Sequence, residues 1–268
     1  MIDFAAPTTR RAAFLYVAAF GAGAVALGTR PAFAQAKTEP KLDVVYVPTP
    51  QPLVDRMLVM AEVKPTDFVM DLGCGDGRMI VTAAKTYGTR GYGVDINPER
   101  IEEANANARN AGVADKVKFE VANLFEQSMA KADVLTMYLL TEINLKLRPK
   151  ILAEMKPGSR VVSHAFSMGQ WEPDAKDTVQ GKRAYLWYVP AQVAGTWKVE
   201  GETDLQLDLT QQFQMVMGRV TTNGQQSRVN GKLKGTEIAL NIEGRGRPMT
   251  GRVEGQEIIG ANWRARRS

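Results

Sequence analysis

The 268-residue chain contains a single cysteine, Cys74, and a single histidine, His164. One cysteine excludes an internal disulfide framework, and one histidine leaves no partners for a His/Cys zinc site, so we expect no metal centre. An excess of one charge sign is also missing, because the formal net charge is only +5. The basic residues are scattered among acids, apart from a tail run of Arg264, Arg266 and Arg267. This composition argues against nucleic acid as a partner.

The first 34 residues have the parts of an export signal. Arg10 and Arg11 precede an uncharged, alanine-rich stretch that runs to Leu27, and Ala32-Phe33-Ala34 follows it. These parts resemble a twin-arginine signal peptide with an A-x-A cleavage site. Because a bilayer span needs roughly 20 apolar residues, cleavage is favoured over a permanent anchor. We therefore expect residues 1–34 to be a signal peptide and the protein to be exported to the periplasm, with action in the cytoplasm before export as the alternative.

Downstream of the leader, apolar runs of strand length alternate with segments of helical periodicity. Such alternation predicts an α/β domain with a doubly wound, mostly parallel sheet covered by helices on both faces, over residues 42–195. The expected helices span 53–61, 79–84, 99–110 and 143–155, and the expected strands span 68–72, 91–96, 117–121, 134–138 and 160–164.

Beyond Pro190 the hydrophobic period changes to two. Leucines alternate with polar residues in 205–209, and apolar residues, Met215 and Met217 among them, alternate with glutamines in 212–217. Period two is typical of antiparallel strands with one face in water, which would place these methionines on the dry face.

A repeat within this region has the form of glycine-bounded hairpins, since residues 231–238 resemble residues 251–258. We expect a small C-terminal antiparallel β-domain over 196–268, either a meander or a barrel. The pattern alone does not assign residues 196–199 to one domain or the other.

A glycine-rich segment, Asp71-Leu72-Gly73-Cys74-Gly75-Asp76-Gly77, comes directly after the first expected strand. In a doubly wound sheet this position is the carboxyl edge, where ligands bind, and glycines allow close approach of the backbone. The spacing G-x-G-x-G differs from the dinucleotide pattern, and Asp76 would repel a pyrophosphate. A ligand that carries an ammonium and a sulfonium would instead gain from Asp71 and Asp76.

The next two strands supply further ligand candidates. Asp95 follows the second strand, about 20 residues past the loop, where a carboxylate can accept both ribose hydroxyls. Ile96 would pack on an adenine, and Asn123, after the third strand, could hydrogen-bond its edge. Three such positions on successive strands predict a cofactor that contains an adenosyl group.

These residues carry a family resemblance. The order VMDLGCGDGR, GYGVDINPERI, FEVANLF and ADVLTMYLL resembles the class I S-adenosylmethionine-dependent methyltransferases, over roughly residues 46–189. More narrowly, Tyr46–Thr49 and Tyr138–Leu140 are similar to the protein-lysine methyltransferases that act on ATP synthase c-subunit and adenine nucleotide translocase. The resemblance implies S-adenosylmethionine as cofactor and a protein lysine as acceptor.

The site predicted on this basis has three parts. Tyr138 is the expected catalytic residue, because it is the polar group best placed to orient the amine. Tyr46 and Thr49 would cover the cofactor. The expected cofactor-binding residues are Asp71, Gly73, Gly75, Asp76, Gly77, Asp95, Ile96, Asn123 and Leu124.

The same residues allow other interpretations. Met137-Tyr138-Leu139-Leu140 stands where many amino-methyltransferases of other groups carry Asn/Asp-Pro-Pro-aromatic, which disfavours nucleic-acid bases and glutamine amides as acceptors. Cys74 is more simply structural than a nucleophile, and His164 more simply a hydrogen-bonded strand residue than a base. Two alternative functions remain, a small-molecule methyltransferase whose β-domain shapes the pocket, and a non-enzymatic envelope-binding protein with a vestigial cofactor site. The pattern leaves the oligomeric state open.

Overall fold

The computed structural model describes residues 46–200 and 205–268. The predicted signal peptide, residues 1–34, lies outside the described residues. Within them, no helix combines the length and the apolar character needed to cross a bilayer.

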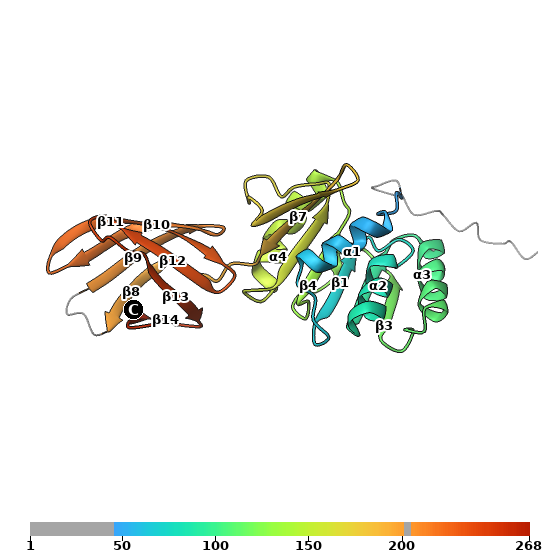
Figure 1. Cartoon of the computed structure of the whole chain (residues 1–268), viewed down its shortest axis with the longest axis horizontal. Coiled ribbons are helices and arrows are strands. Elements are labelled where there is room, and N and C mark those ends of the chain that lie inside the picture. Colours follow the sequence, from blue (N-terminus) through green and yellow to red (C-terminus); the bar gives the residue numbers. More distant parts are fainter. Residues whose placement is uncertain (1–45, 201–204) are drawn as a thin grey trace, which may run out of the picture. The chain divides into compact units, whose positions relative to one another are not determined.

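The described chain begins with an α/β domain built on a seven-stranded sheet (Figure 1). The strand order is β3-β2-β1-β4-β5-β7-β6, in which β1 to β5 are parallel and β7 runs antiparallel to both β5 and β6. The strands are β1 (Phe68–Leu72), β2 (Arg90–Asp95), β3 (Val117–Val121), β4 (Val134–Met137), β5 (Arg160–His164), β6 (Ala175–Val179) and β7 (Lys182–Tyr188).

Within the part of the chain that the structure describes, four α-helices cover the sheet. Adjacent strand residues explain how both faces of the sheet are buried. Val134 packs in the core that holds α1, α2 and α3, whereas Leu135 packs in the core that holds α4. This alternation is what a parallel strand buried on both faces requires. The helices are α1 (Gln51–Met60), α2 (Arg78–Tyr87), α3 (Pro98–Asn110) and α4 (Thr141–Glu154), with a 3₁₀ turn η1 at Leu124–Glu126.

The strand order reverses between β1 and its neighbour β4. At such a point the connections leave toward opposite faces of the sheet, which opens a crevice at the carboxyl ends of the strands. The glycine segment 73–77 lies there, because it joins β1 to α2. The fold therefore places this segment where a ligand can reach it.

The hairpin of β6 and β7 was not predicted. Its strands join through Gln180 and Gly181, whose φ values of 50° and 77° are both in the left-handed region, as in a type I′ turn. The sequence signal for this hairpin was the pair Gln180-Gly181, since glycine is common in two-residue turns between strands.

The C-terminal part is a closed antiparallel barrel of eight strands, in the order β10-β11-β12-β13-β14-β15-β8-β9. Its strands are β8 (Gly195–Glu200), β9 (Leu205–Gln212), β10 (Met215–Thr222), β11 (Gln225–Lys234), β12 (Glu237–Ile242), β13 (Met249–Glu254), β14 (Glu257–Gly260) and β15 (Arg264–Arg267). Residues 196–199, which the pattern left unassigned, pair with β9 and β15 and so belong to the barrel. The predicted fold class, a mostly parallel α/β sheet followed by a small antiparallel β-domain, is confirmed.

The sequence repeat corresponds to two equivalent hairpins of the barrel. Gly235 and Gly255 are the first residues of two-residue turns and have φ values of 62° and 60°, as in type II′ turns. In both hairpins the second pair from the turn is apolar and buried, Leu233 with Ile238 in one and Val253 with Ile258 in the other. The two glycine-bounded hairpins expected from the repeat are confirmed.

The predicted phase of β10 was wrong. Met215 and Met217 are 50% and 56% exposed, whereas Val216 and Val220 are buried in the barrel core. The chain reverses in a two-residue turn at Phe213 and Gln214, which resets the alternation relative to β9. Phe213 adopts a φ of 53° without being glycine, so the turn has no recognisable sequence signature.

Candidate cofactor site

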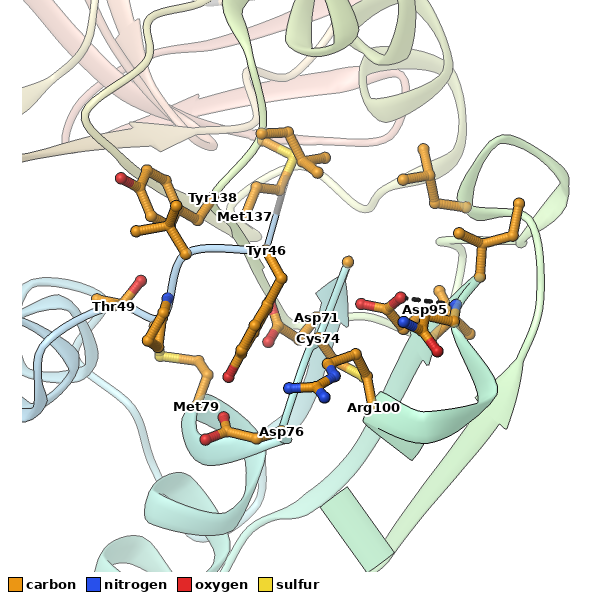
Figure 2. A pocket seen from close by; sticks show the side chains of 18 of the residues that line it. Tyr46, Thr49, Asp71, Cys74, Asp76, Met79, Asp95, Arg100, Met137 and Tyr138 are labelled. Atoms are coloured by element: carbon orange, nitrogen blue, oxygen red, sulfur yellow. Dashed lines mark hydrogen bonds between the residues drawn. The ribbon is translucent and has the colours of Figure 1, made fainter. Parts of the chain in front are cut away.

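A cavity of about 490 Å³ lies at the carboxyl ends of β1, β2 and β4 (Figure 2). Its volume is that of a pocket for a small molecule. Ten of the residues singled out in the sequence line it, namely Tyr46, Thr49, Asp71, Gly73, Asp76, Asp95, Ile96, Asn123, Leu124 and Tyr138. Gly75 and Gly77 are not among the lining residues, and they act on the shape of the loop instead.

The glycine loop is fixed by its backbone. The amides of Gly73 and Cys74 both donate to the carbonyl of Val94 at 2.9 Å, which ties the loop to β2. Gly77 has a φ of 74°, and a Cβ there would lie 2.7 Å from Phe119 and 2.8 Å from Ala104. Positive φ and lack of space together explain why glycine is needed here.

Asp95 is held with both carboxylate oxygens turned to backbone amides. Oδ2 accepts from Gly75 N at 2.9 Å and Oδ1 accepts from Asn97 N at 2.9 Å. Each carboxylate oxygen has a further lone pair, so the group can still accept hydrogen bonds from a diol in the cavity. The loop and the carboxylate that the sequence placed 20 residues apart are thus in direct contact.

Asp71 is buried at the base of the cavity, where Thr136 Oγ1 donates to its Oδ1 at 2.8 Å. Burial raises the pKa of Asp71 to about 7, with Asp95 and Asp76 acting in the same direction against the hydrogen bond from Thr136. A cation in the cavity would favour the ionised form of this carboxyl group.

Asp76 is neutralised by a residue that the sequence analysis missed. Arg78 donates from Nε to Oδ1 of Asp76 at 2.9 Å and from Nη2 to Oδ2 at 2.5 Å. Burial tends to raise the pKa of Asp76, but the hydrogen bonds and charge of Arg78 outweigh it and hold the pKa below its usual range. Asp76 therefore already has a cationic partner before any ligand is considered, unlike Asp71.

Tyr46 crosses the cavity, with its hydroxyl toward Asp76 and the guanidinium of Arg100 over its ring, 4.7 Å from the centroid (Figure 2). A Cβ on Gly75 would lie 2.3 Å from the Tyr46 ring, so this glycine provides the space for the tyrosine. Burial, and then the charge of Asp76, raise the pKa of the Tyr46 hydroxyl. Segment 46–49 thus packs directly on the glycine loop.

Ile96, Asn123 and Leu124 form the side of the cavity next to Asp95. Ile96 is 38% exposed, an apolar surface open to an adenine. The Asn123 carbonyl oxygen Oδ1 caps η1 by accepting from Phe125 N at 3.0 Å, and its amide donates to Glu126 at 3.1 Å. The proposed contact between Asn123 and adenine stays a prediction.

Tyr138 and Thr49 lie at the end of the cavity away from Asp95 (Figure 2). The ring of Tyr138 stacks on His164, which is buried and does not line the cavity. Burial lowers the pKa of His164 to about 4, with Lys182 adding to the effect. A group that is neutral at physiological pH and shielded from the cavity fits the structural interpretation of this histidine.

Cys74 lines the cavity but is buried. Burial, and then the charge of Asp71, raise the pKa of the thiol well above its ordinary value. The thiol is therefore protonated at neutral pH, which is the opposite of an activated nucleophile.

Arg78, Arg100 and Phe166 are the main lining residues that the sequence analysis did not single out. Arg78 and Arg100 could have been suspected from their positions in the first turns of α2 and α3, which begin next to the loop and Asp95. Phe166 reaches the cavity from the segment after β5 and had no comparable signal.

The sequence matches known proteins in this part of the chain. The family described as ANTKMT methyltransferase domain matches residues 71–175. A protein-lysine N-methyltransferase of Saccharolobus islandicus is 50% identical over 131 residues, which cover 48% of this chain and 81% of that protein. The adenine nucleotide translocase lysine N-methyltransferase of Mus musculus is 33% identical over 136 residues, which are 50% of this chain but only 58% of the mouse protein.

A solved structure is also that of a methyltransferase, but its description names a different acceptor. It is a protein from Salinibacter ruber described as an RNA methyltransferase in complex with S-adenosyl-L-homocysteine, with 48% identity and a TM-score of 0.54. The match covers 55% of this chain and 96% of that one, so almost half of this chain has no counterpart there.

Proposed function

The chain belongs to the S-adenosylmethionine-dependent methyltransferases, in the family that includes the protein-lysine N-methyltransferase of Saccharolobus islandicus, and we propose that its methyl acceptor is a lysine amine of a protein. The observation that carries the proposal is a single cavity that is lined by Asp95 at one end and by Tyr138 at the other. In addition, half of the aligned residues are identical to those of a protein-lysine methyltransferase.

The residues at hand fit the cofactor, S-adenosylmethionine. We propose that Asp95 accepts the ribose hydroxyls, that Ile96, Asn123 and Leu124 enclose the adenine, and that Asp71 faces the cationic amino-acid end. Gly73, Gly75 and Gly77 shape the loop beneath, and Tyr46 and Thr49 cover the cofactor. The buried Asp71, whose pKa of about 7 places it half-ionised at neutral pH, is the group most responsive to a cation.

When bound, the cofactor supplies an electrophilic methyl on a sulfonium sulfur, and that sulfur keeps the electron pair of the C–S bond as the new C–N bond forms. The chain contributes mainly alignment of the amine with the methyl, which can be worth up to about 7–11 kcal/mol in favourable cases. Little acid–base machinery is required, in agreement with a cavity whose acids serve binding.

The amine must be neutral to act as a nucleophile. A free lysine has a pKa of about 10.4, so on the order of one in a thousand is neutral at pH 7. Leu140, Met137 and Phe166 line the cavity near Tyr138, and such apolar walls lower an amine's pKa by desolvation. We propose that the Tyr138 hydroxyl then orients the amine, which loses its proton to water.

The proposal is tested by incubating the purified protein with methyl-labelled cofactor and a cell-envelope extract. Label should appear in a protein band and, after acid hydrolysis, in methyl-lysine. Asp95→Ala should strongly reduce the label, which shows that labelling depends on this site. If the wild-type protein places label in RNA, or only in small molecules, the lysine assignment is overturned.

The non-enzymatic alternative makes a different prediction. A vestigial site would bind no cofactor, so calorimetry with S-adenosylhomocysteine on the purified protein should give no heat of binding while the fold stays intact. Saturable binding at one site per chain would reject it.

We also propose that residues 1–34 direct export by the twin-arginine route, and that 42–195 and 196–268 are the two domains of the exported protein. The arginine pair, the alanine-rich stretch and the A-x-A site support the export proposal. Fractionation of cells that express a C-terminally tagged chain should place a shortened form in the periplasm, and Arg10→Lys with Arg11→Lys should keep it in the cytoplasm. A full-length cytoplasmic product in both cases would contradict export.

A further inference from the structure

The phenol of Tyr138 is packed against two aromatic rings. Its ring stacks on His164 with centroids 3.7 Å apart at 25°, and on Phe166 with centroids 5.9 Å apart at 28°. Tyr138 directly follows β4 and His164 ends β5, two neighbouring parallel strands. Aromatic stacking of this kind restricts a ring to a narrow range of orientations.

The segment that holds His164 and Phe166 is a strained turn. Ala165 has a φ of 63°, and Phe166 N donates to the His164 carbonyl at 2.8 Å. Ser163 Oγ donates to the Phe166 carbonyl at 2.7 Å, and the buried Asn144 donates to the same carbonyl at 3.2 Å. Strain beside a functional site persists only where the surroundings hold it, as these two side chains do here.

His164 is itself fixed by a hydrogen bond. Its Nδ1 lies 3.0 Å from Thr49 Oγ1, and both side chains are buried. A neutral imidazole can be either the donor or the acceptor of this bond. Since the other ring nitrogen, Nε2, has no partner among the described residues, the hydroxyl of Thr49 is the imidazole's one hydrogen-bond partner there.

Thr49 is connected to the cofactor loop by its other polar atom. The Thr49 carbonyl accepts from Arg78 Nη1 at 2.9 Å, and Arg78 is paired with Asp76 of the loop. A continuous series of contacts thus runs from Asp76 through Arg78, Thr49 and His164 to Tyr138.

We propose that Thr49 and His164 are positioning residues, which hold the phenol of Tyr138 in the orientation that meets the acceptor amine and link it to the loop that binds the cofactor. The inference rests on the proposed function, in which Tyr138 orients the amine. His164 does not line the cavity, and the hydroxyl of Thr49 is bonded to His164, so both act through Tyr138.

The chain offers a matched control for the key variant. Thr89 is a buried threonine in which Oγ1 has no hydrogen-bond partner among the described residues. Thr89→Val makes the same chemical change as Thr49→Val without removing a contact. Thr49→Ser keeps the hydroxyl and serves as the conservative variant.

The first measurement needs no acceptor. In the full chain with labelled tyrosine rings, seven tyrosines give few signals, and Tyr138→Phe identifies those of Tyr138. Stacking on the imidazole should shift these signals upfield. Thr49→Val should move them toward unstacked values while Thr89→Val leaves them in place, and unchanged Tyr138 signals in Thr49→Val would overturn the proposal.

The second measurement is kinetic, with the lysine acceptor. Thr49→Val should lower kcat about tenfold, the value of one hydrogen bond. The Kd for S-adenosylhomocysteine should change less than about threefold, because valine has the shape of threonine and still covers the cofactor. Thr49→Ser should recover most of this loss. In a Tyr138→Phe background, Thr49→Val should lower kcat by less than about twofold, because the residue it acts through is already altered.

Failure of the two proposals is distinguishable. If the wild-type chain labels no protein lysine, the proposed function fails, whereas the Tyr138 signals still test the positioning. If lysine is labelled but Thr49→Val and Thr89→Val give the same kcat, the positioning role is wrong. It is also wrong if Thr49→Val lowers kcat as much in the Tyr138→Phe background as in the wild-type chain.

Discussion

Asp71 is the residue whose chemistry depends most on its surroundings, because burial raises its pKa to about 7. Since this folded-state value lies above that of an unfolded aspartate, the carboxyl group favours the fold when protonated, and its contribution to stability is lost as the pH rises through about 7. A cationic ligand has the opposite preference and needs the ionised form.

We therefore predict that affinity for S-adenosylhomocysteine, which carries an ammonium group, falls about tenfold between pH 8 and pH 6, as the ionised fraction of Asp71 falls. Calorimetry at several pH values measures the slope, and binding near pH 7 should release a fraction of a proton. Asp71→Asn should bind more weakly and show no slope over this range. An equal slope in wild type and Asp71→Asn would assign the titration to another group.

Asp95 gives the second prediction. Asp95→Ala removes the charged acceptor proposed for the ribose and also the acceptor for Gly75 N and Asn97 N. Charge-assisted hydrogen bonds are worth about 1.5–3 kcal/mol, so the Kd for S-adenosylhomocysteine should rise at least about tenfold. Asp115→Ala, at an exposed aspartate before β3, should leave it unchanged. An unaltered Kd in Asp95→Ala would remove the ribose assignment.

Residues that directly follow a strand were easier to predict from the sequence than residues whose role depends on contacts with distant parts of the chain. Asp71, the glycines and Asp95 follow strands directly, so the strand pattern alone brought them to one edge. Arg78 was missed because its role depends on Asp76 and on the carbonyl of Thr49, 29 residues earlier in the chain. The hydrogen bond between Thr49 and His164, which are 115 residues apart, is likewise a product of the fold.

At the scale of the element, the two glycines that flank helix α2 distinguish two effects of a substitution by alanine, namely backbone strain and steric crowding. It is flanked by Gly77 with a φ of 74° and by Gly88 with a φ of 78°, so alanine is strained at both positions. A Cβ on Gly88 would meet open space, whereas one on Gly77 would lie within 3 Å of Phe119 and Ala104.

We predict that Gly88→Ala costs about 1 kcal/mol of unfolding free energy from backbone strain, and that Gly77→Ala costs about 2–4 kcal/mol because overpacking is added. Urea unfolding of both variants measures the difference. Gly77→Ala should also weaken S-adenosylhomocysteine binding, since the loop must shift. Equal losses of stability in the two variants would show that crowding at Gly77 is relieved at no cost.

The elements that the sequence predicted share a strong periodicity. Strands β1, β4 and β5 were found because buried parallel strands are near-continuous apolar runs bounded by turns, whereas β3 alternates apolar with charged residues. Strand β6 is largely exposed and carries no such run. In β10 the period of two was evident, but its phase depended on the turn at Phe213, where a residue other than glycine adopts a positive φ.

At the scale of the whole molecule, the cavity and the barrel are built from separate parts of the sequence. Every residue that lines the cavity lies between Tyr46 and Phe166, whereas the barrel begins at Gly195. The barrel has a hydrophobic core of its own, in which Trp197, Leu207 and Val216 are fully buried. The Salinibacter ruber methyltransferase matches over 96% of its length with only 55% of this chain, so a related fold exists with little room for such a barrel.

A single substitution can disrupt the barrel in the full chain. Gly218 of β10 faces β9 so closely that a Cβ would lie 2.0 Å from the carbonyl oxygen of Asp208, and Gly218→Val should therefore break the β9–β10 pairing.

We predict that this variant loses the near-ultraviolet signal of the buried Trp197 yet binds S-adenosylhomocysteine with a Kd within about threefold of wild type, because no cavity residue is affected. Gly246→Val, between β12 and β13 where a Cβ would meet open space and φ is not positive, is the matched control for introducing valine at a barrel glycine. If Gly218→Val abolished cofactor binding while Gly246→Val did not, the barrel would have to support the cavity. If binding persists but labelling of protein lysine disappears, the barrel acts on the acceptor and not on the cofactor.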